Sequence, residues 1–297
     1  MPKGHKFPLE KYRLVRQALA ADSRFHFHPA PFISRADLLR VHHPDYVEAF
    51  IKGTLDRQII RRIGFPWSTE LVNRTLASAG ATLAATAIAI KTGFGGALAG
   101  GTHHAFRAEG SGFCVFNDLA LAIEWARANT AFSRFAVVDC DVHQGDGTAA
   151  IFAEDPSVFT LSIHAAKNFP FRKQKSTLDV ELPDETEDDS YLAALIPALG
   201  QVWAFRPQLI LFQAGVDTLS IDRLGHLCLT EQGLTLRNRL VITQAYKLGI
   251  PLVITLGGGY SEPIIHTVRA HAQTFENAAE VFFPLTDTIR TNDLTRS

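Results

Sequence analysis

The sequence of 297 residues predicts one α/β domain: a central, mostly parallel β-sheet with helices on both faces. Short apolar stretches suited to buried strands alternate with longer helical stretches, which is the pattern of βαβ units. No low-complexity linker or internal repeat divides the chain, so we expect a single domain over residues 1–297, frayed after about residue 284. Several apolar strands are followed by polar side chains, at the edge where such sheets bind their ligands.

The composition is that of a globular protein with a sizeable core. Hydrophobic residues make up 46% of the sequence, and the formal net charge is −1, so direct nucleic-acid binding is not expected. The chain holds three widely spaced cysteines without a CxxC pair, and its first residues lack the apolar core of a secretory signal. Both features favour a cytoplasmic location without membrane association. Pattern alone does not set the oligomeric state.

The N-terminal part of the chain is predicted to be mainly helical. Charged and apolar residues at helical spacing indicate a surface helix over residues 7–19. The stretch Ala30-Pro31-Phe32-Ile33 indicates a short strand. Ser34 can then cap a helix that ends at Leu39.

A further helix is expected to begin at Pro44. It follows His42 and His43, which point in different directions on any regular element and are expected to be structural. Residues 69–92 are rich in Ala, Thr and Leu and predict a long buried helix that ends at Gly93. Its first turns are polar and its uninterrupted apolar run is too short for a membrane span.

The middle of the chain alternates strands and helices. Short apolar runs predict strands at residues 97–100, 135–140 and 158–163, and an amphipathic pattern predicts a helix at 118–128. Residues 179–189 hold seven acidic side chains and predict a solvated loop. Attraction of a cationic substrate is the alternative interpretation of this loop.

The last third continues the same alternation. A helix is expected from Ser190, followed by a fully apolar strand at 209–212. Thr230 can cap a helix over residues 231–248, and a last strand is expected at 252–256.

The end of the strand at 135–140 has the most unusual chemistry. Asp139, Asp141 and His143 stand at alternate positions, so an extended backbone would point them the same way. Burying two carboxylates and an imidazole on one face costs roughly several kcal/mol each unless something compensates them. A divalent cation is the simplest compensator, and a hydrogen-bonded polar cluster is the alternative.

Other predicted strands end in similar chemistry, and the ends of parallel strands meet at one edge of a sheet. The segments concerned are His103-His104, Asp217 and Gly257-Gly258-Gly259-Tyr260. The candidate metal ligands are Asp141, His143 and Asp217. Three protein ligands with one open position are typical of a catalytic zinc, and Fe²⁺, Co²⁺ or Mn²⁺ would suit the same donors.

The neighbouring residues suggest hydrolysis. Asp139 and Asp146 flank the metal segment, where they can fix the tautomers of His103 and His104. One of these histidines could take a proton from water and deliver it to a leaving amine. Tyr260 follows glycines that allow close backbone approach, so its phenol could stabilise an oxyanion.

Five motifs together resemble the zinc-dependent histone deacetylase family, which has the arginase–deacetylase fold. They are Gly101-Thr102-His103-His104-Ala105, Gly112-Phe113-Cys114-Val115-Phe116-Asn117-Asp118, the run from Asp139 to Gly147, Gly215-Val216-Asp217 and Gly257-Gly258-Gly259-Tyr260. The resemblance covers nearly the whole chain, from Gly4 to about Phe283. The segments 143–145, 187–191 and 222–225 are most similar to the class IV branch and to bacterial histone deacetylase-like amidohydrolases.

The resemblance implies a role for each site residue. The implied zinc ligands are Asp141, His143 and Asp217. His104, partnered by Asp146, would be the general base and acid, and His103, partnered by Asp139, would support it electrostatically. Tyr260 would hydrogen-bond the substrate carbonyl.

The resemblance also implies two further sites. The residues of a narrow acyl-lysine tunnel would be Gly112 and Phe113 on one wall, Phe169 or Phe171 near the opposite wall, and Gly258. A structural K⁺ or Na⁺ would be held by Asp139, Ser162 and the backbone carbonyls of Asp141 and His143. A strand-end hydroxyl that bonds to backbone is the alternative interpretation of Ser162.

The implied activity is hydrolysis of an N-acylated amine, with acyl-lysine in a protein or peptide as the first substrate. Gln144 replaces a histidine of many family members and leaves the metal residues intact. We find no counterpart of the family's mouth aspartate that grips a peptide backbone, so acetylpolyamines or related acyl amines are the alternative substrates. A non-catalytic acyl-lysine-binding or scaffold protein is the third interpretation, which the combination of His104, Asp146 and Tyr260 disfavours.

Overall fold

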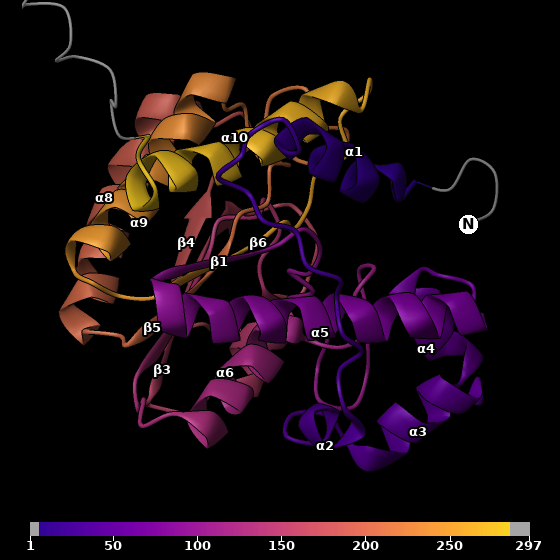
Figure 1. The fold of residues 1–297 in the computed structure, drawn as a ribbon. Coiled ribbons are helices and arrows are strands. Elements are labelled where there is room, and N and C mark those ends of the chain that lie inside the picture. Colours follow the sequence, from indigo (N-terminus) through magenta and orange to yellow (C-terminus); the bar gives the residue numbers. More distant parts are fainter. Residues whose placement is uncertain (1–5, 286–297) are drawn as a thin grey trace, which may run out of the picture.

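The computed structural model describes residues 6–285, whose centre is a parallel sheet with the strand order β1-β6-β5-β2-β3-β4 (Figure 1). All five neighbouring pairs of strands run parallel. The strands are β1 (Phe94–Ala97), β2 (Phe135–Asp139), β3 (Val158–Ala165), β4 (Leu178–Leu182), β5 (Leu209–Gln213) and β6 (Leu252–Thr255). The predicted fold class is therefore confirmed.

Helices connect the strands and cover both faces of the sheet. They are α1 (Glu10–Leu19), α2 (Arg35–Leu38), α3 (Pro44–Lys52), α4 (Arg57–Ile63), α5 (Thr69–Thr92), α6 (Asp118–Asn129), α7 (Asp146–Ile151), α8 (Asp188–Phe205), α9 (Glu231–Lys247) and α10 (Ile265–Phe282). In Figure 1, α5 and α6 lie on one side of the sheet, and α1, α8, α9 and α10 lie on the other. Within the described residues, none of these helices combines the length and apolar character needed to cross a membrane.

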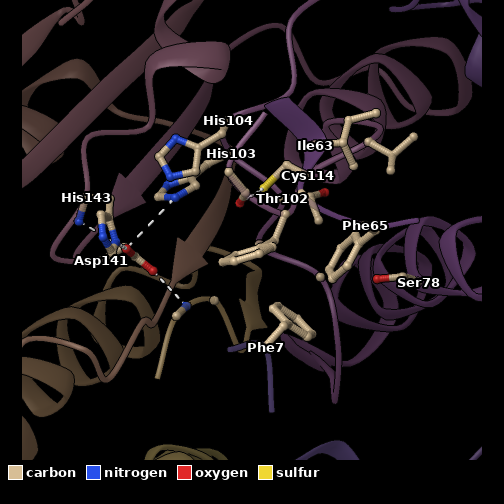
Figure 2. Close-up of a pocket in the computed structure, with 18 of the residues that line it drawn as sticks. Phe7, Ile63, Phe65, Ser78, Thr102, His103, His104, Cys114, Asp141 and His143 are labelled. Atoms are coloured by element: carbon tan, nitrogen blue, oxygen red, sulfur yellow. Dashed lines mark hydrogen bonds and ion pairs between the residues drawn. The ribbon is translucent and has the colours of Figure 1, made fainter. Parts of the chain in front are cut away.

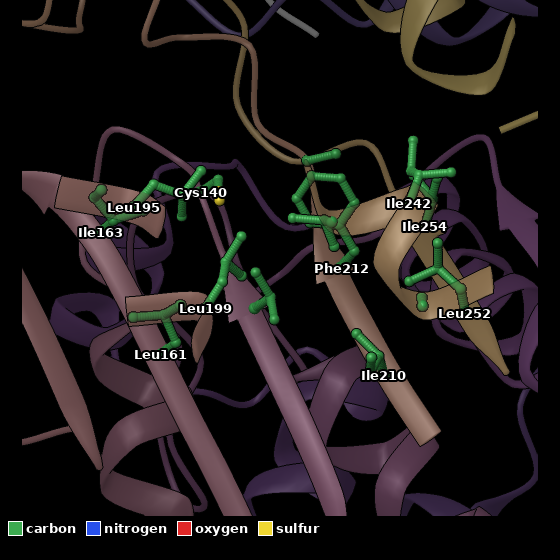
Figure 3. Packing of buried hydrophobic residues seen from close by; sticks show 14 of the residues in the cluster. Cys140, Leu161, Ile163, Leu195, Leu199, Ile210, Phe212, Ile242, Leu252 and Ile254 are labelled. Atoms are coloured by element: carbon green, nitrogen blue, oxygen red, sulfur yellow. The ribbon is translucent and has the colours of Figure 1, made fainter. Parts of the chain in front are cut away.

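Alternation along the strands produces two hydrophobic clusters. Val137, Leu211 and Val253 belong to the cluster under α5 and α6. Their chain neighbours Phe212 and Ile254 belong to the cluster under α8, α9 and α10 (Figure 3). Because both faces are covered, every residue of β2, β3, β5 and β6 is buried, as is usual for the inner strands of a parallel sheet.

The acidic stretch 179–189 was predicted to be a loop, and its first part is instead the edge strand β4. Val180 and Leu182 pack on the core, whereas Glu181 is exposed. An edge strand needs only one apolar face, so acidic residues at every second position are compatible with it. The predicted helix then begins at Asp188, two residues earlier than expected.

Two other predictions near α5 were wrong. The strand expected at 97–100 lies earlier, at 94–97, where Gly95 packs so tightly that a Cβ would stand 2.0 Å from the carbonyl oxygen of Ala85. Residues 30–33 form no strand, because this segment lies across α5 and Ile33 donates its N–H to the carbonyl oxygen of Leu76. Three helices, α4, α7 and α10, were not predicted.

The crossing of α5 gives a testable expectation at Gly80. A Cβ there would lie 1.9 Å from the carbonyl oxygen of Pro31, which is backbone and has little room to move. Alanine favours a helix over glycine by about 1 kcal/mol, but this clash outweighs that gain. We expect Gly80→Ala to lower the free energy of unfolding by about 1–3 kcal/mol.

Gly200 of α8 is the matched control, because a Cβ there meets no atom within 4 Å. Gly200→Ala should raise the free energy of unfolding by about 0.5–1 kcal/mol. Urea unfolding followed by circular dichroism measures both. Equal stabilisation by the two substitutions would show that residues 30–33 do not press on α5.

Candidate active site

The candidate site is built at the carboxyl ends of four adjacent strands, β1, β6, β5 and β2. The segments that follow them carry His103-His104, Tyr260, Asp217 and Asp141 with His143, so residues distant in sequence meet at one edge. One detail differs from expectation. Strand β2 ends at Asp139, so Asp141 and His143 are presented by the following turn and not by strand alternation.

Asp141, His143 and Asp217 form the one three-residue group among the described residues with metal-binding geometry. One ligand atom from each lies within 4.8 Å of the others. Nδ1 of His143 is 2.9 Å from Oδ1 of Asp141 and 3.2 Å from Oδ2 of Asp217. Oδ2 of Asp217 is fully buried without a properly aligned hydrogen-bond donor. Two carboxylates and an imidazole that converge in this way fit a divalent cation.

The electrostatics of this group favour a positive charge between the two carboxylates. Burial and the nearby carboxylate of Asp141 raise the pKa of Asp217 to about 7. Burial would lower the pKa of His143, but the two carboxylates outweigh burial and raise it to about 10. In both cases the carboxylates gain from a cation between them, and a metal ion would supply that charge in place of a proton.

Neighbouring groups hold the two carboxylates in place. Oδ2 of Asp141 accepts the N–H of Gly258 at 2.7 Å, and Oδ1 of Asp217 accepts the N–H of Val142 at 2.9 Å. A Cβ on Gly258 would lie 1.8 Å from Oδ2 of Asp217. Gly258, which was predicted to line a tunnel, lines the cavity and also orients a candidate ligand.

The two histidines are each paired with a buried carboxylate. Nδ1 of His103 lies 2.7 Å from Oδ2 of Asp139, and Nδ1 of His104 lies 2.6 Å from Oδ1 of Asp146. Their ring centroids are 4.1 Å apart. In each ring the carboxylate fixes the proton on Nδ1, which leaves Nε2 available to contact the substrate or water.

The two imidazoles have opposite pKa shifts. Burial would lower the pKa of His103, but Asp139 and Asp141 overcome burial and raise it to about 9. Burial and the positive charge of His103 lower the pKa of His104 to about 4, against the opposing effect of Asp146. His104 is therefore neutral at pH 7 and able to accept a proton, whereas His103 carries positive charge.

Tyr260 lines the same cavity as the two histidines. Its backbone N–H donates to Oδ2 of Asp222 at 2.6 Å, and its ring lies 6.3 Å from that of Phe113. Burial, with the carboxylates of Asp217 and Asp141, raises its pKa well above the usual range for a phenol. Tyr260 consequently stays protonated and can donate a hydrogen bond.

A cavity of about 710 Å³ leads to these residues (Figure 2). Phe113 lies on one wall, where Gly112 and Phe113 donate their N–H groups to the carbonyl oxygens of Arg62 and Ile63. Phe169 also lines the cavity, with its ring 4.9 Å from the ring of His104. A Cβ on Gly112 would come within 2.5 Å of His104, so glycine keeps this passage open.

Phe171 lines the same cavity but is 89% exposed, so of the two predicted phenylalanines Phe169 is the one packed at the reacting groups. The groups predicted to hold a monovalent cation also lie together, because Ser162 pairs with Asp139 in the register of β2 and β3. The hydroxyl of Ser162 lies 3.0 Å from Nδ1 of His164 and not on backbone. The cation site stays a prediction.

Three supporting residues were not predicted. Asp118 accepts the N–H groups of Gly101 and Thr102 and so fixes the turn before the two histidines. Gln213 donates to the carbonyl oxygen of Gly101, and Asp222 anchors Tyr260. Gln213 ends β5, whereas Asp118 and Asp222 lie in the segments 112–118 and 222–225 of the family resemblance, but the backbone partners of all three are not recorded by any sequence pattern.

Comparison with known proteins agrees with this architecture. The sequence model of the family described as histone deacetylase domain matches residues 5–275. An uncharacterized protein of Picosynechococcus is 43% identical over 286 residues, which is 95% of either chain. The histone deacetylase-like amidohydrolase of Pseudomonas aeruginosa is 31% identical, over 88% of this chain and 74% of that protein.

One further relative and one solved structure extend the comparison. Histone deacetylase 2 of Arabidopsis thaliana is 31% identical over 82% of this chain, which spans 65% of the plant protein's length. The crystal structure of the HDA15 HD domain superposes with a TM-score of 0.76 over 95% of this chain and 86% of that one, at 23% identity, and shows the shared fold.

The fold, together with the buried Asp-His-Asp group and the two histidine–carboxylate pairs, defines a protein of the hydrolase class. The chain belongs to the histone deacetylase family.

Proposed function

We propose that this protein is a zinc-dependent amidohydrolase that removes an acyl group from an N-acylated amine, with acyl-lysine as the substrate class. The observation that carries the proposal is the position of Asp141, His143 and Asp217 beside the His104–Asp146 pair at the inner end of one cavity. Zn²⁺ is the ion we propose, and Fe²⁺ or Co²⁺ would suit the same ligands. A structural K⁺ or Na⁺ is proposed at Asp139 and Ser162.

The cation would be held by the Asp-His-Asp group and, when bound, supplies Lewis acidity for the amide carbonyl and for water. The protein's own side chains do the rest. His104 takes the proton from the attacking water, since its Nε2 is free and its ring is neutral at pH 7. It then returns this proton to the amine nitrogen, which lets the carbon–nitrogen bond break. Asp146 keeps the ring in the required tautomer.

Tyr260 and the aromatic walls act on the substrate. The phenol of Tyr260 donates a hydrogen bond to the carbonyl oxygen as negative charge develops there. Phe113 and Phe169 contact the methylene chain of the lysine and exclude water from the reacting amide. The positive charge of His103 disfavours protonation of His104 before the substrate binds, so that His104 is available to take the proton from water.

The charge of the cavity favours acyl-lysine over acetylpolyamines. Among the described residues that line it, the cationic side chains are Arg61, Arg62, Arg74 and Lys167. The one carboxylate in the lining is Asp141, which belongs to the proposed metal group. Arg62 pairs with Glu109 and Lys167 with Asp184, so Arg61 and Arg74 are the lining cations that would disfavour a polyamine with free ammonium groups. A neutral acyl-lysine side chain would not be repelled.

Turnover assays on an acetyl-lysine peptide and on an acetylated polyamine test the proposal. We expect kcat/KM to favour the peptide by about tenfold or more, a difference of about 1.4 kcal/mol. Activity should be lost with a chelator and restored by Zn²⁺. A preference for the polyamine would overturn the substrate class. If neither substrate were turned over by metal-loaded protein, a non-catalytic acyl-lysine-binding role would replace the proposal.

A further inference from the structure

We propose that Arg237 of α9 is a positioning residue that fixes the spacing of the two loops carrying the metal ligands. The inference rests on the proposed function and extends it to a residue outside the cavity. Arg237 has no exposed surface, although arginine is rarely buried completely. Arg237 is not among the described residues that line the cavity.

A single nitrogen of Arg237 connects both ligand loops. Nη1 donates to the carbonyl oxygen of Cys140 at 3.0 Å and to that of Gly215 at 2.7 Å. Cys140 immediately precedes Asp141, and Gly215 stands two residues before Asp217. The two loops also lie close together, since a Cβ on Gly215 would stand 2.3 Å from Oδ2 of Asp141.

Side chains of α9 and α10 hold the other nitrogens of the guanidinium. Nε and Nη2 both donate to Oδ1 of Asn238, at 3.1 and 2.9 Å. Asn238 in turn donates to the hydroxyl of Thr274 on α10 at 3.0 Å. Two helices therefore set the plane of the guanidinium, and this rigid fork reaches the carbonyl groups of the loops.

Charge supports the same conclusion. Within residues 6–285, no carboxylate forms an ion pair with Arg237, so its positive charge is balanced by carbonyl oxygens and the face of Phe212. Asp141 and Asp217 repel each other before a metal ion binds. A cation behind their backbones opposes this repulsion and holds both loops at the separation that a metal ion requires.

Zinc affinity, measured by competition with a chromophoric chelator, tests this role without reference to turnover. We expect Arg237→Met to weaken zinc binding about 10–100-fold, as is usual when a group that orients metal ligands is removed. Arg237→Lys should recover part of this loss, because an ammonium group retains donors but not the fork. The exposed Arg239, which pairs with Glu280, provides the matched control Arg239→Met, for which we expect unchanged affinity.

Ile242→Ala separates positioning from simple loss of stability. Ile242 is buried on the same helix within the hydrophobic cluster under α8, α9 and α10, and its truncation leaves a cavity there without removing a hydrogen bond to the ligand loops (Figure 3). We expect it to lower Tm with little change in zinc affinity. Wild-type affinity in Arg237→Met, or in Arg237→Lys if the first variant does not fold, would overturn the inference. Failure of the wild-type protein to bind zinc would instead overturn the proposed function.

Discussion

Replacing His104 by asparagine should lower kcat for an acetyl-lysine peptide by about 10²–10⁴, the usual contribution of a positioned general acid–base group. Asparagine can still donate a hydrogen bond to Asp146, so that buried carboxylate is not left alone. His104 is not one of the metal-binding residues, so zinc content should stay at the wild-type level. The expected loss is therefore one of proton transfer.

The protonation states of the two histidines explain why His104 is the base. The positive charge of His103, 4.1 Å away between ring centroids, adds to burial in lowering the pKa of His104 to about 4. The ring of His104 is then available as an acceptor across the neutral range. The pKa of His103 is shifted the other way, because the carboxylates of Asp139 and Asp141 outweigh its burial, and His103 is therefore the less suitable proton acceptor.

His43→Asn is the matched control for this prediction. The ring of His43 is exposed and caps α3 by accepting the N–H of Asp45, a role that asparagine performs equally well. Its kcat should equal that of the wild-type protein. Steady-state kinetics with metal analysis on both variants decide the matter. Full activity in His104→Asn would mean that another group takes the proton.

The convergence of strand ends at one edge of a parallel sheet accounts for what the sequence could predict about the site. Asp141, His143 and Asp217 sit in motifs that directly follow apolar runs, and the edge of a parallel sheet brings such motifs together. This argument concerns where the strands end, so it holds even though β2 stops at Asp139. The expectation that Asp141 and His143 point the same way because they alternate along a strand fails beyond that residue. Periodicity thus located the segments, but not how each side chain is presented.

Residues that act through tertiary contacts left no such signal. Arg237 reaches the ligand loops from a helix with an ordinary pattern, and the partners of both Arg237 and Asp222 are backbone groups of the site. A bond to a carbonyl oxygen places no constraint on the partner's side chain, so no sequence motif records it. For the same reason the segment 30–33 resembled a strand, since its backbone bonds to α5 rather than to the sheet.

Removing one oxygen atom from Tyr260 should have a similarly large effect. We expect Tyr260→Phe to lower kcat by about 10²–10³ with little change in KM, because the hydroxyl hydrogen bond strengthens as charge develops on the carbonyl oxygen. The ring itself should keep its place. It packs against Phe113 and Phe7 and lies 5.4 Å beneath Nζ of the buried Lys11, and all three contacts involve ring faces or edges.

Tyr46→Phe removes a phenol hydroxyl outside the cavity and serves as the control. The hydroxyl of Tyr46 donates to the carbonyl oxygen of Val115 at 2.8 Å, so its loss should cost about 0.5–1.5 kcal/mol of unfolding free energy and leave kcat unchanged. The two variants therefore separate stability from chemistry. If Tyr260→Phe changed only Tm, the developing oxyanion would have to be stabilised by the metal ion alone, and Asp222 would anchor Tyr260 for packing rather than for catalysis.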